Sequence, residues 1–322
     1  MTHRQQNAQR IESKCLPPGL DILRCIETEP PELDFVLPGF LAGTVGGLIA
    51  AGGVGKSTLA LQAAMDIAID VAGADLLGLG IQKHGRVVIL AGEDPEIALH
   101  HRIRSIAPRL SPEAREALAE SLTIVPCVGH GVDIMDSSWF EEVRRVSEGA
   151  RLVVVDTLTR FHSLDENDAA DAKAVMAALE RLAKLAGCAV LYLHHVSKNA
   201  AMNGMADLQQ AARGSSVFVD NARWLAFVAG MTAEESKSDA WAHCCLSDDD
   251  RRRFIRFGVT KQNYGAPSGH RWYRRGDGGV LLAWEAASQD SAESVAANVD
   301  AAPRRSRRRS GLPASPRPWG SA

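Results

Sequence analysis

The sequence predicts an α/β protein with a mainly parallel, twisted sheet, helices on both faces of the sheet and an edge of antiparallel strands. Apolar strand-like runs alternate with helix-like segments from about residue 33 to 285, a pattern typical of crossover units in a parallel sheet. A glycine-rich stretch joins the first of these long runs to the first helix. The alternation thins after residue 222, which favours hairpins at one edge.

The elements follow from hydrophobic periodicity. The candidate strands are apolar runs at residues 46–50, 86–91, 123–127, 152–156, 189–194, 224–229 and 254–260. The candidate helices lie between them, at about 57–72, 95–107, 112–121, 137–148 and 168–186. In the last helix Val175, Leu179, Leu182 and Leu185 recur at three- and four-residue spacings, which is the signature of an amphipathic helix.

Composition divides the chain into three parts. Residues 1–30 contain two proline-rich turns and no amphipathic period, so we expect a flexible N-terminal arm. Residues 31–285 form the predicted core. Residues 286–322 are rich in Ala and Ser and include an arginine run at 304–309, so we expect a disordered tail that either binds an anionic partner or is simply solvated.

Several classes of protein are disfavoured. No apolar run approaches the roughly 20 residues of a membrane helix, and the polar N-terminus lacks a signal-peptide core, so we expect a cytoplasmic protein without a membrane partner. The six cysteines include no Cys-x-x-Cys pair, which disfavours a zinc ribbon. The formal net charge of −3 is neutral evidence on nucleic acid binding.

The most informative segment is the glycine-rich stretch at residues 50–58, called here the phosphate loop. Its glycines let backbone N–H groups point at phosphate oxygens, and the helix behind it adds partial positive charge. Lys56 is expected to reach the β- and γ-phosphates, and the Ser57 hydroxyl to bind Mg²⁺. The residues expected to hold the nucleoside triphosphate are Gly52, Gly53, Val54, Gly55, Lys56, Ser57 and Thr58.

Two other strand ends carry carboxylates. Asp156 follows four apolar residues, and a parallel sheet would place it beside the phosphate loop as the second partner of Mg²⁺. Glu93 and Asp94 end another strand. We interpret Glu93 as the base that activates water and Asp94 as a cap of the following helix; the alternative is that both merely cap that helix.

A further strand ends in His194 and His195. A polar group at that edge could sense the γ-phosphate and pass its state to the segment that follows, residues 197–213. That segment is long and polar, as functional loops are, and Lys198 and Arg213 give it the capacity to bind the phosphates of DNA.

These residues resemble the RepA-type hexameric replicative DNA helicases of broad-host-range plasmids, a group of RecA/DnaB-like ATPases. The resemblance spans roughly residues 33–280. The stretches that carry it are 33–38, 43–46, 52–57, 91–95, 156–158, 160–162, 193–198, 213–216, 220–221, 223–224, 261, 263–267, 271–272 and 274–275.

The resemblance implies a RecA-like core in a homohexameric ring that threads single-stranded DNA and hydrolyses ATP with Mg²⁺. It supports Glu93 as the water-activating residue and Asp156 as the magnesium carboxylate, and it favours His195 over His194 as the sensor. In such rings the loop after the sensor strand, 197–213 here, lines the central channel.

A ring of this kind needs a cation donated across the subunit boundary. Arg223 is the first candidate, because it matches the arginine that precedes a tryptophan in the family. Lys261 is the second. In wider DnaB-like relatives its region resembles Lys-x-Arg-x-Gly-Pro, and Asn263 stands here in place of that arginine. The alternative for both cations is an ordinary salt bridge.

The leading functional hypothesis is a replicative DNA helicase of plasmids or other mobile elements, with a replication initiator and a primase as candidate partners. The alternatives are a RecA-like recombination or repair ATPase that remodels DNA without unwinding it, and a binding module switched by ATP. The expected base, sensor and trans cation favour turnover over a pure switch.

Overall fold

The computed structural model describes residues 16–195, 216–242, 244–265 and 269–284. Its core is a nine-stranded sheet within these residues, in the order β11-β10-β9-β8-β3-β7-β6-β4-β5. The strands are β3 (Val45–Ala50), β4 (Val87–Ala91), β5 (Leu122–Pro126), β6 (Leu152–Asp156), β7 (Ala189–His195), β8 (Trp224–Gly230), β9 (Phe254–Gln262), β10 (Arg271–Arg275) and β11 (Leu281–Trp284).

The expected mainly parallel sheet with an antiparallel edge is confirmed. Strands β8, β3, β7, β6, β4 and β5 run parallel to one another, each beside the next. Strands β9, β10 and β11 then continue the sheet beyond β8 in antiparallel pairing. Strands β10 and β11, and a separate hairpin of β1 (Phe35–Leu37) and β2 (Phe40–Leu41), were not predicted as individual strands.

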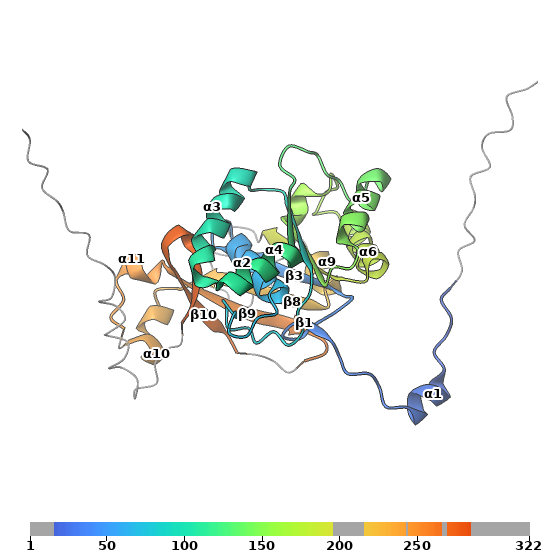
Figure 1. The fold of residues 1–322 in the computed structure, drawn as a ribbon, viewed down its shortest axis with the longest axis horizontal. Coiled ribbons are helices and arrows are strands. Elements are labelled where there is room, and N and C mark those ends of the chain that lie inside the picture. Colours follow the sequence, from blue (N-terminus) through green and yellow to red (C-terminus); the bar gives the residue numbers. More distant parts are fainter. Residues whose placement is uncertain (1–15, 196–215, 243, 266–268, 285–322) are drawn as a thin grey trace, which may run out of the picture.

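Helices cover both faces of the sheet, as expected (Figure 1). One hydrophobic cluster joins the sheet to α2 (Lys56–Ala68) and to the parts of α3 (Glu96–Ile106) and α4 (Pro112–Ser121) that face it. A second cluster joins the other face to α5 (Ser137–Ser147), α6 (Ala169–Ala186) and α9 (Ser216–Asn221). Short helical turns complete the described chain: η1 (Ala107–Arg109), η2 (Leu158–Arg160), η3 (Glu235–Lys237), α10 (Asp239–Ala242), α11 (Asp248–Arg251) and η4 (Asp277–Gly279).

Two glycines in β3, the strand before the phosphate loop, leave room for aromatic rings to pack against its backbone. A Cβ atom at Gly46 would lie 2.9 Å from the ring of Phe40, and one at Gly47 would lie 2.6 Å from Cζ of Tyr192. Contacts this short are not tolerated in a close-packed interior. Glycine at both positions therefore lets bulky rings pack directly on both sides of β3.

The N-terminal arm is exposed wherever it is described. Residues 16–33 are exposed, and the short helix α1 (Ile22–Glu27) buries no residue and stands away from the sheet (Figure 1). The boundaries expected at residues 30 and 285 stay a prediction, because residues 1–15 and the predicted tail lie outside the described residues. Among the described helices, none combines the length and the apolarity that crossing a bilayer requires.

Candidate functional site

Four neighbouring strands bring the expected site residues to one edge of the sheet. Strands β3, β7, β6 and β4 are adjacent and parallel, so their carboxyl ends share an edge. The phosphate loop follows β3, His195 ends β7, Asp156 ends β6 and Glu93 follows β4. In open α/β sheets ligands bind at this edge.

The phosphate loop turns tightly into helix α2. Gly53 and Gly55 have φ angles of 75° and 102°, a region that strongly favours glycine, and α2 begins immediately after them at Lys56. Lys56 is buried, and its Nζ lies 3.2 Å from Nδ1 of His195. Burial lowers the pKa of Lys56, although Asp156 and Glu93 act in the opposite direction.

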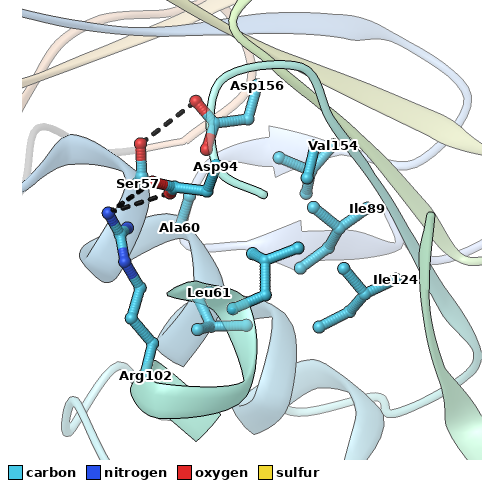
Figure 2. Close-up of a pocket in the computed structure, with 11 residues that line it drawn as sticks. Ser57, Ala60, Leu61, Ile89, Asp94, Arg102, Ile124, Val154 and Asp156 are labelled. Carbon is cyan, nitrogen blue, oxygen red and sulfur yellow. Dashed lines mark hydrogen bonds and ion pairs between the residues drawn. The ribbon is translucent and has the colours of Figure 1, made fainter. Parts of the chain in front are cut away.

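Ser57 and Asp156, the two residues expected to bind Mg²⁺, lie side by side. The Ser57 hydroxyl donates a hydrogen bond of 3.1 Å to Oδ1 of Asp156 (Figure 2). Burial raises the pKa of the Asp156 carboxyl to about 6, against the lowering effects of the Ser57 hydrogen bond and of Lys56. A hydroxyl and a carboxylate beside a phosphate site are donors that suit Mg²⁺, so these two residues fit the expected metal.

Glu93 is held between two polar partners. The Thr157 hydroxyl donates to its Oε1 at 2.9 Å, and Nε2 of His195 lies 3.4 Å from the same oxygen. Burial acts to raise the pKa of Glu93, but Thr157, His195 and Lys56 outweigh it and hold the pKa below its usual range. Glu93 is therefore an ionised carboxylate beside the phosphate loop.

The expectation that Asp94 caps helix α3 is wrong. The residue at the N-cap is Pro95, and α3 has no side-chain cap. Asp94 instead makes an ion pair with Arg102, with 2.8 Å between Oδ2 and Nη2 (Figure 2). The pair forms because α3 carries Arg102 within reach of the end of β4. The alternative that Glu93 and Asp94 both only cap the helix is wrong for the same reason, because α3 has no side-chain cap.

The two consecutive histidines point to different environments, as alternation along a strand requires. His195 faces Lys56 and Glu93. His194 is buried, with its Nδ1 3.7 Å from Glu166 and its ring 5.4 Å from that of Phe218. Only His195 lies where a γ-phosphate sensor is expected.

Sequence reasoning missed three side chains of the site. Thr157 bonds to Glu93, Arg102 pairs with Asp94, and the Arg275 guanidinium donates to the backbone carbonyls of Gly53 and Val54 in the phosphate loop. Arg275 belongs to a stretch that carries the family resemblance, which was the available signal. The sequence did not predict that β10 pairs with β9, and this pairing is what brings Arg275 to the phosphate loop.

Arg223 and Lys261 lie at the opposite side of the sheet from the phosphate loop, where the parallel strands β3 and β8 begin. Arg223 precedes β8, and its backbone N–H bonds to Val45 at the start of β3, whereas the phosphate loop follows the end of β3. At about 3.3 Å per residue, the five steps along β3 separate the two edges by roughly 16 Å. Lys261 donates to the carbonyls of Val219 and Asp220 at the end of α9. Neither cation belongs to this chain's own phosphate site.

The Arg223 side chain is exposed and makes no hydrogen bond or ion pair with the residues that the structure describes. Within the described part of the chain, Arg223 therefore does not form the ordinary salt bridge that was the alternative. Lys198 and Arg213, expected to bind DNA, lie outside the described residues.

A cavity of about 280 Å³ joins these groups. Its walls come from the phosphate loop, from the ends of β4, β7 and β10 and from α3. The lining residues are Ala51, Gly53, Gly55, Lys56, Ser57, Thr58, Glu93, Asp94, Arg102, His195, Arg275 and Gly279. Figure 2 shows a second, smaller pocket between α2 and the sheet, whose aliphatic lining includes Leu61, Ile89 and Val154. Ser57, Asp94 and Arg102 line both, so the polar groups of the site border a closely packed apolar region.

Comparison with known families places the chain. The family model described as AAA domain matches residues 12–201, more than half of the chain. The chain belongs to this AAA-domain family. The match covers the phosphate loop and the strand ends that carry Glu93, Asp156 and His195, so the family assignment and the site rest on the same residues.

This AAA-domain protein is similar to several solved structures. A solved ATPase domain is 16% identical, with a TM-score of 0.50, and the match covers 75% of this chain and 85% of that chain. A DnaB-like replicative helicase solved with primase is 14% identical (TM-score 0.49; 76% and 58% covered), and the RadB recombinase is 14% identical (TM-score 0.46; 77% and 92% covered). The protein has the RecA-like fold of P-loop ATPases.

Proposed function

We propose that this chain is an ATP-dependent replicative DNA helicase that forms a ring and couples hydrolysis to movement on single-stranded DNA in plasmid or mobile-element replication. The observation that carries the proposal is the split between two edges of the sheet. One edge gathers Lys56, Glu93 and Asp156, whereas the exposed Arg223 lies at the other. In the proposed assembly, a neighbouring copy would supply Arg223 to this site.

The proposed hydrolysis begins with placement of the triphosphate. Backbone N–H groups of the phosphate loop and the Lys56 ammonium would hold the β- and γ-phosphates. Mg²⁺, held by Ser57 and Asp156, would supply positive charge to the phosphate oxygens. The ionised Glu93 would accept a proton from the attacking water, while Thr157 and His195 keep its carboxylate in place.

The proposed sensor is His195. Its ring lies within 3.4 Å of both Lys56 and Glu93, so a change in the charge of the γ-phosphate would be felt by the imidazole. His195 ends β7, and the segment that follows contains Lys198. A shift of the ring would therefore be passed directly to the segment in which Lys198 and Arg213 are proposed to hold DNA.

The assembly is proposed to be a homohexamer, on the resemblance to RepA-type helicases. Arg223 would stabilise transition-state charge in the neighbour's site, as an arginine finger does, with Lys261 as a second candidate. A replication initiator and a primase are the proposed partners.

The test is unwinding of forked DNA, measured beside ATPase activity with and without single-stranded DNA. We expect ATP-dependent unwinding, stimulation of ATPase by the single strand, and loss of both in Lys56→Ala, which removes the ammonium that holds the phosphates. Stimulated ATPase without unwinding on forks of either polarity would contradict the helicase proposal and favour a remodelling ATPase. Nucleotide binding without any turnover would favour the ATP-switched module.

A further inference from the structure

A second, strongly basic cavity lies beside the nucleotide cavity. It is an open groove of about 770 Å³ between the end of α3 with η1 and the outer antiparallel strands. Arg109, Arg253, Arg274 and Arg275 line it, and Asp277 is the single carboxylate that the described residues contribute to its lining. We call it the arginine groove.

Three of these arginines lack partners. Within the described residues, the side chains of Arg109, Arg253 and Arg274 make no ion pair and no hydrogen bond. Three arginines of the neighbouring segments are paired; they are Arg251 with Asp248, Arg252 with Asp249 and Arg256 with Glu235. The groove thus gathers three arginines that have no ion-pair partner among the described residues, and gathered like charges repel one another until an anion arrives.

The unpaired guanidiniums suit phosphate groups. Each guanidinium presents a planar fork of donors that matches phosphate oxygens. The three side chains come from η1, from the connection between α11 and β9, and from β10. They line a volume many times the roughly 30 Å³ of a water molecule. This layout fits several successive phosphates better than one small ion.

Arg275 joins the groove to the nucleotide cavity, because it lines both. Its guanidinium donates to the carbonyls of Gly53 and Val54 in the phosphate loop. Its backbone N–H donates to the carbonyl of Arg253 at 2.8 Å. A ligand that moves Arg253 or Arg274 would therefore act on the phosphate loop through Arg275.

We propose that the arginine groove binds the phosphodiester backbone of single-stranded nucleic acid, and that its occupancy acts on the phosphate loop through Arg275. This site is separate from the expected DNA contacts at Lys198 and Arg213. The choice of a single strand as ligand rests on the proposed helicase function. The description of the groove does not depend on that function, and neither do its unpaired arginines or its link to the phosphate loop.

The test measures binding of fluorescent single-stranded DNA at several salt concentrations, with a non-hydrolysable ATP analogue filling the phosphate site. The variant combines Arg109→Gln, Arg253→Gln and Arg274→Gln, none of which touches the phosphate loop. We expect weaker binding, and a salt dependence whose log–log slope shrinks by about 0.7 for each phosphate that the variant no longer binds. Stimulation of ATPase by DNA should fall, whereas ATPase without DNA stays at the wild-type rate and reports that the variant is folded.

The matched control is Arg104→Gln. Arg104 is exposed on α3, makes no ion pair with the described residues and does not line the groove, so the substitution removes the same charge nearby. The control should keep the wild-type affinity and salt slope. An equal loss in the control would reduce the effect to general charge and overturn the proposal.

Other outcomes separate this proposal from the proposed function. If the wild type unwinds DNA and the groove variants bind it with an unchanged salt slope, the groove proposal fails and the helicase stands. If the wild type binds no single strand, both fail. Pyrophosphate at equal phosphate concentration should not displace the strand; displacement would make the groove a small-anion pocket and overturn the proposal. If the triple variant does not fold, the three single variants decide the matter by the same slope.

Discussion

At the scale of single residues, the site is a small network of charges around Lys56. Its ammonium, the His195 ring and the Glu93 carboxylate lie within hydrogen-bond reach of one another in a chain. Thr157 adds a neutral donor that keeps Glu93 ionised. An ionised carboxylate is the form that can take a proton from water, so the network suits Glu93 to the proposed role of base.

We expect Glu93→Gln to abolish turnover and spare nucleotide binding. The amide keeps the size of the side chain and can still accept from Thr157, but it cannot accept a proton. Steady-state kcat for ATP should fall by roughly 100- to 10,000-fold, while the affinity for a fluorescent ATP analogue changes little. Glu166→Gln is the matched control, since Glu166 is a partly buried glutamate outside the cavity. A Glu93 variant that retains most of its kcat would contradict the assignment.

At the scale of elements, the positions of the site residues follow from parallel strands that end together. The apolar runs before Glu93, Asp156 and His195 were recognisable in the sequence because buried parallel strands are continuous and hydrophobic. The helices matched within a few residues for a similar reason, since their apolar stripes recur at fixed spacings. These parts of the site were predictable because each depends on local pattern and one topological rule.

The remaining parts depend on contacts that no local pattern carries. Strand β10 is rich in arginine and lacks the apolar run that marks a buried strand, so neither it nor the contact of Arg275 with the phosphate loop was predictable. The pairing of Asp94 with Arg102 likewise could not be predicted, because it depends on where α3 places a guanidinium relative to the end of β4. Short strands such as β2 give too few residues for a period.

Helix α2 also carries a buried carboxyl that makes stability depend on pH. Asp66 accepts backbone N–H bonds from Leu76 and Leu77 at 2.8 and 3.0 Å. Burial nevertheless raises its pKa to about 8, and Asp75 adds to the effect. An unfolded aspartate has a pKa of about 3.9. Between these values the unfolded chain has released a proton that the folded chain retains.

The free energy of unfolding should therefore fall as pH rises from about 4 to about 8, by up to about 1.4 kcal/mol per pH unit from this group. Asp66→Asn removes the titration, so the stability difference between wild type and variant should change steadily with pH. Urea unfolding at pH 5, 6 and 7 measures it, and other titrating groups cancel in the comparison. A constant difference across this range would contradict the prediction.

At the scale of the whole molecule, the two halves of the proposed catalytic machinery are far apart. The pocket with Glu93 is at one edge of the sheet, and Arg223 is at the other, with the length of β3 between them. A single copy cannot bring them together without unfolding its central strand. Turnover is therefore expected to depend on association.

Mixing experiments test this dependence. Arg223→Ala and Glu93→Gln should each be inactive alone. In an equal mixture, half of the subunits keep Glu93, and half of their neighbours keep Arg223, so about a quarter of the head-to-tail junctions should regain activity. The control mixture, Lys56→Ala with Glu93→Gln, should stay inactive, since both residues line the same cavity. Recovery in the control, or none in the test mixture, would contradict trans action by Arg223.

The opposite placement of pocket and arginine has a consequence for symmetry. A two-fold dimer would have to make this contact twice within one self-complementary interface, whereas a head-to-tail interface makes it once at each junction. Copies joined through such a contact repeat one rotation and one translation. If the translation vanishes and the rotation divides a full circle, the assembly closes; otherwise it grows as a helix. The number of subunits would then be set by an angle between neighbours, and a single substitution at that junction could exchange a ring for a filament.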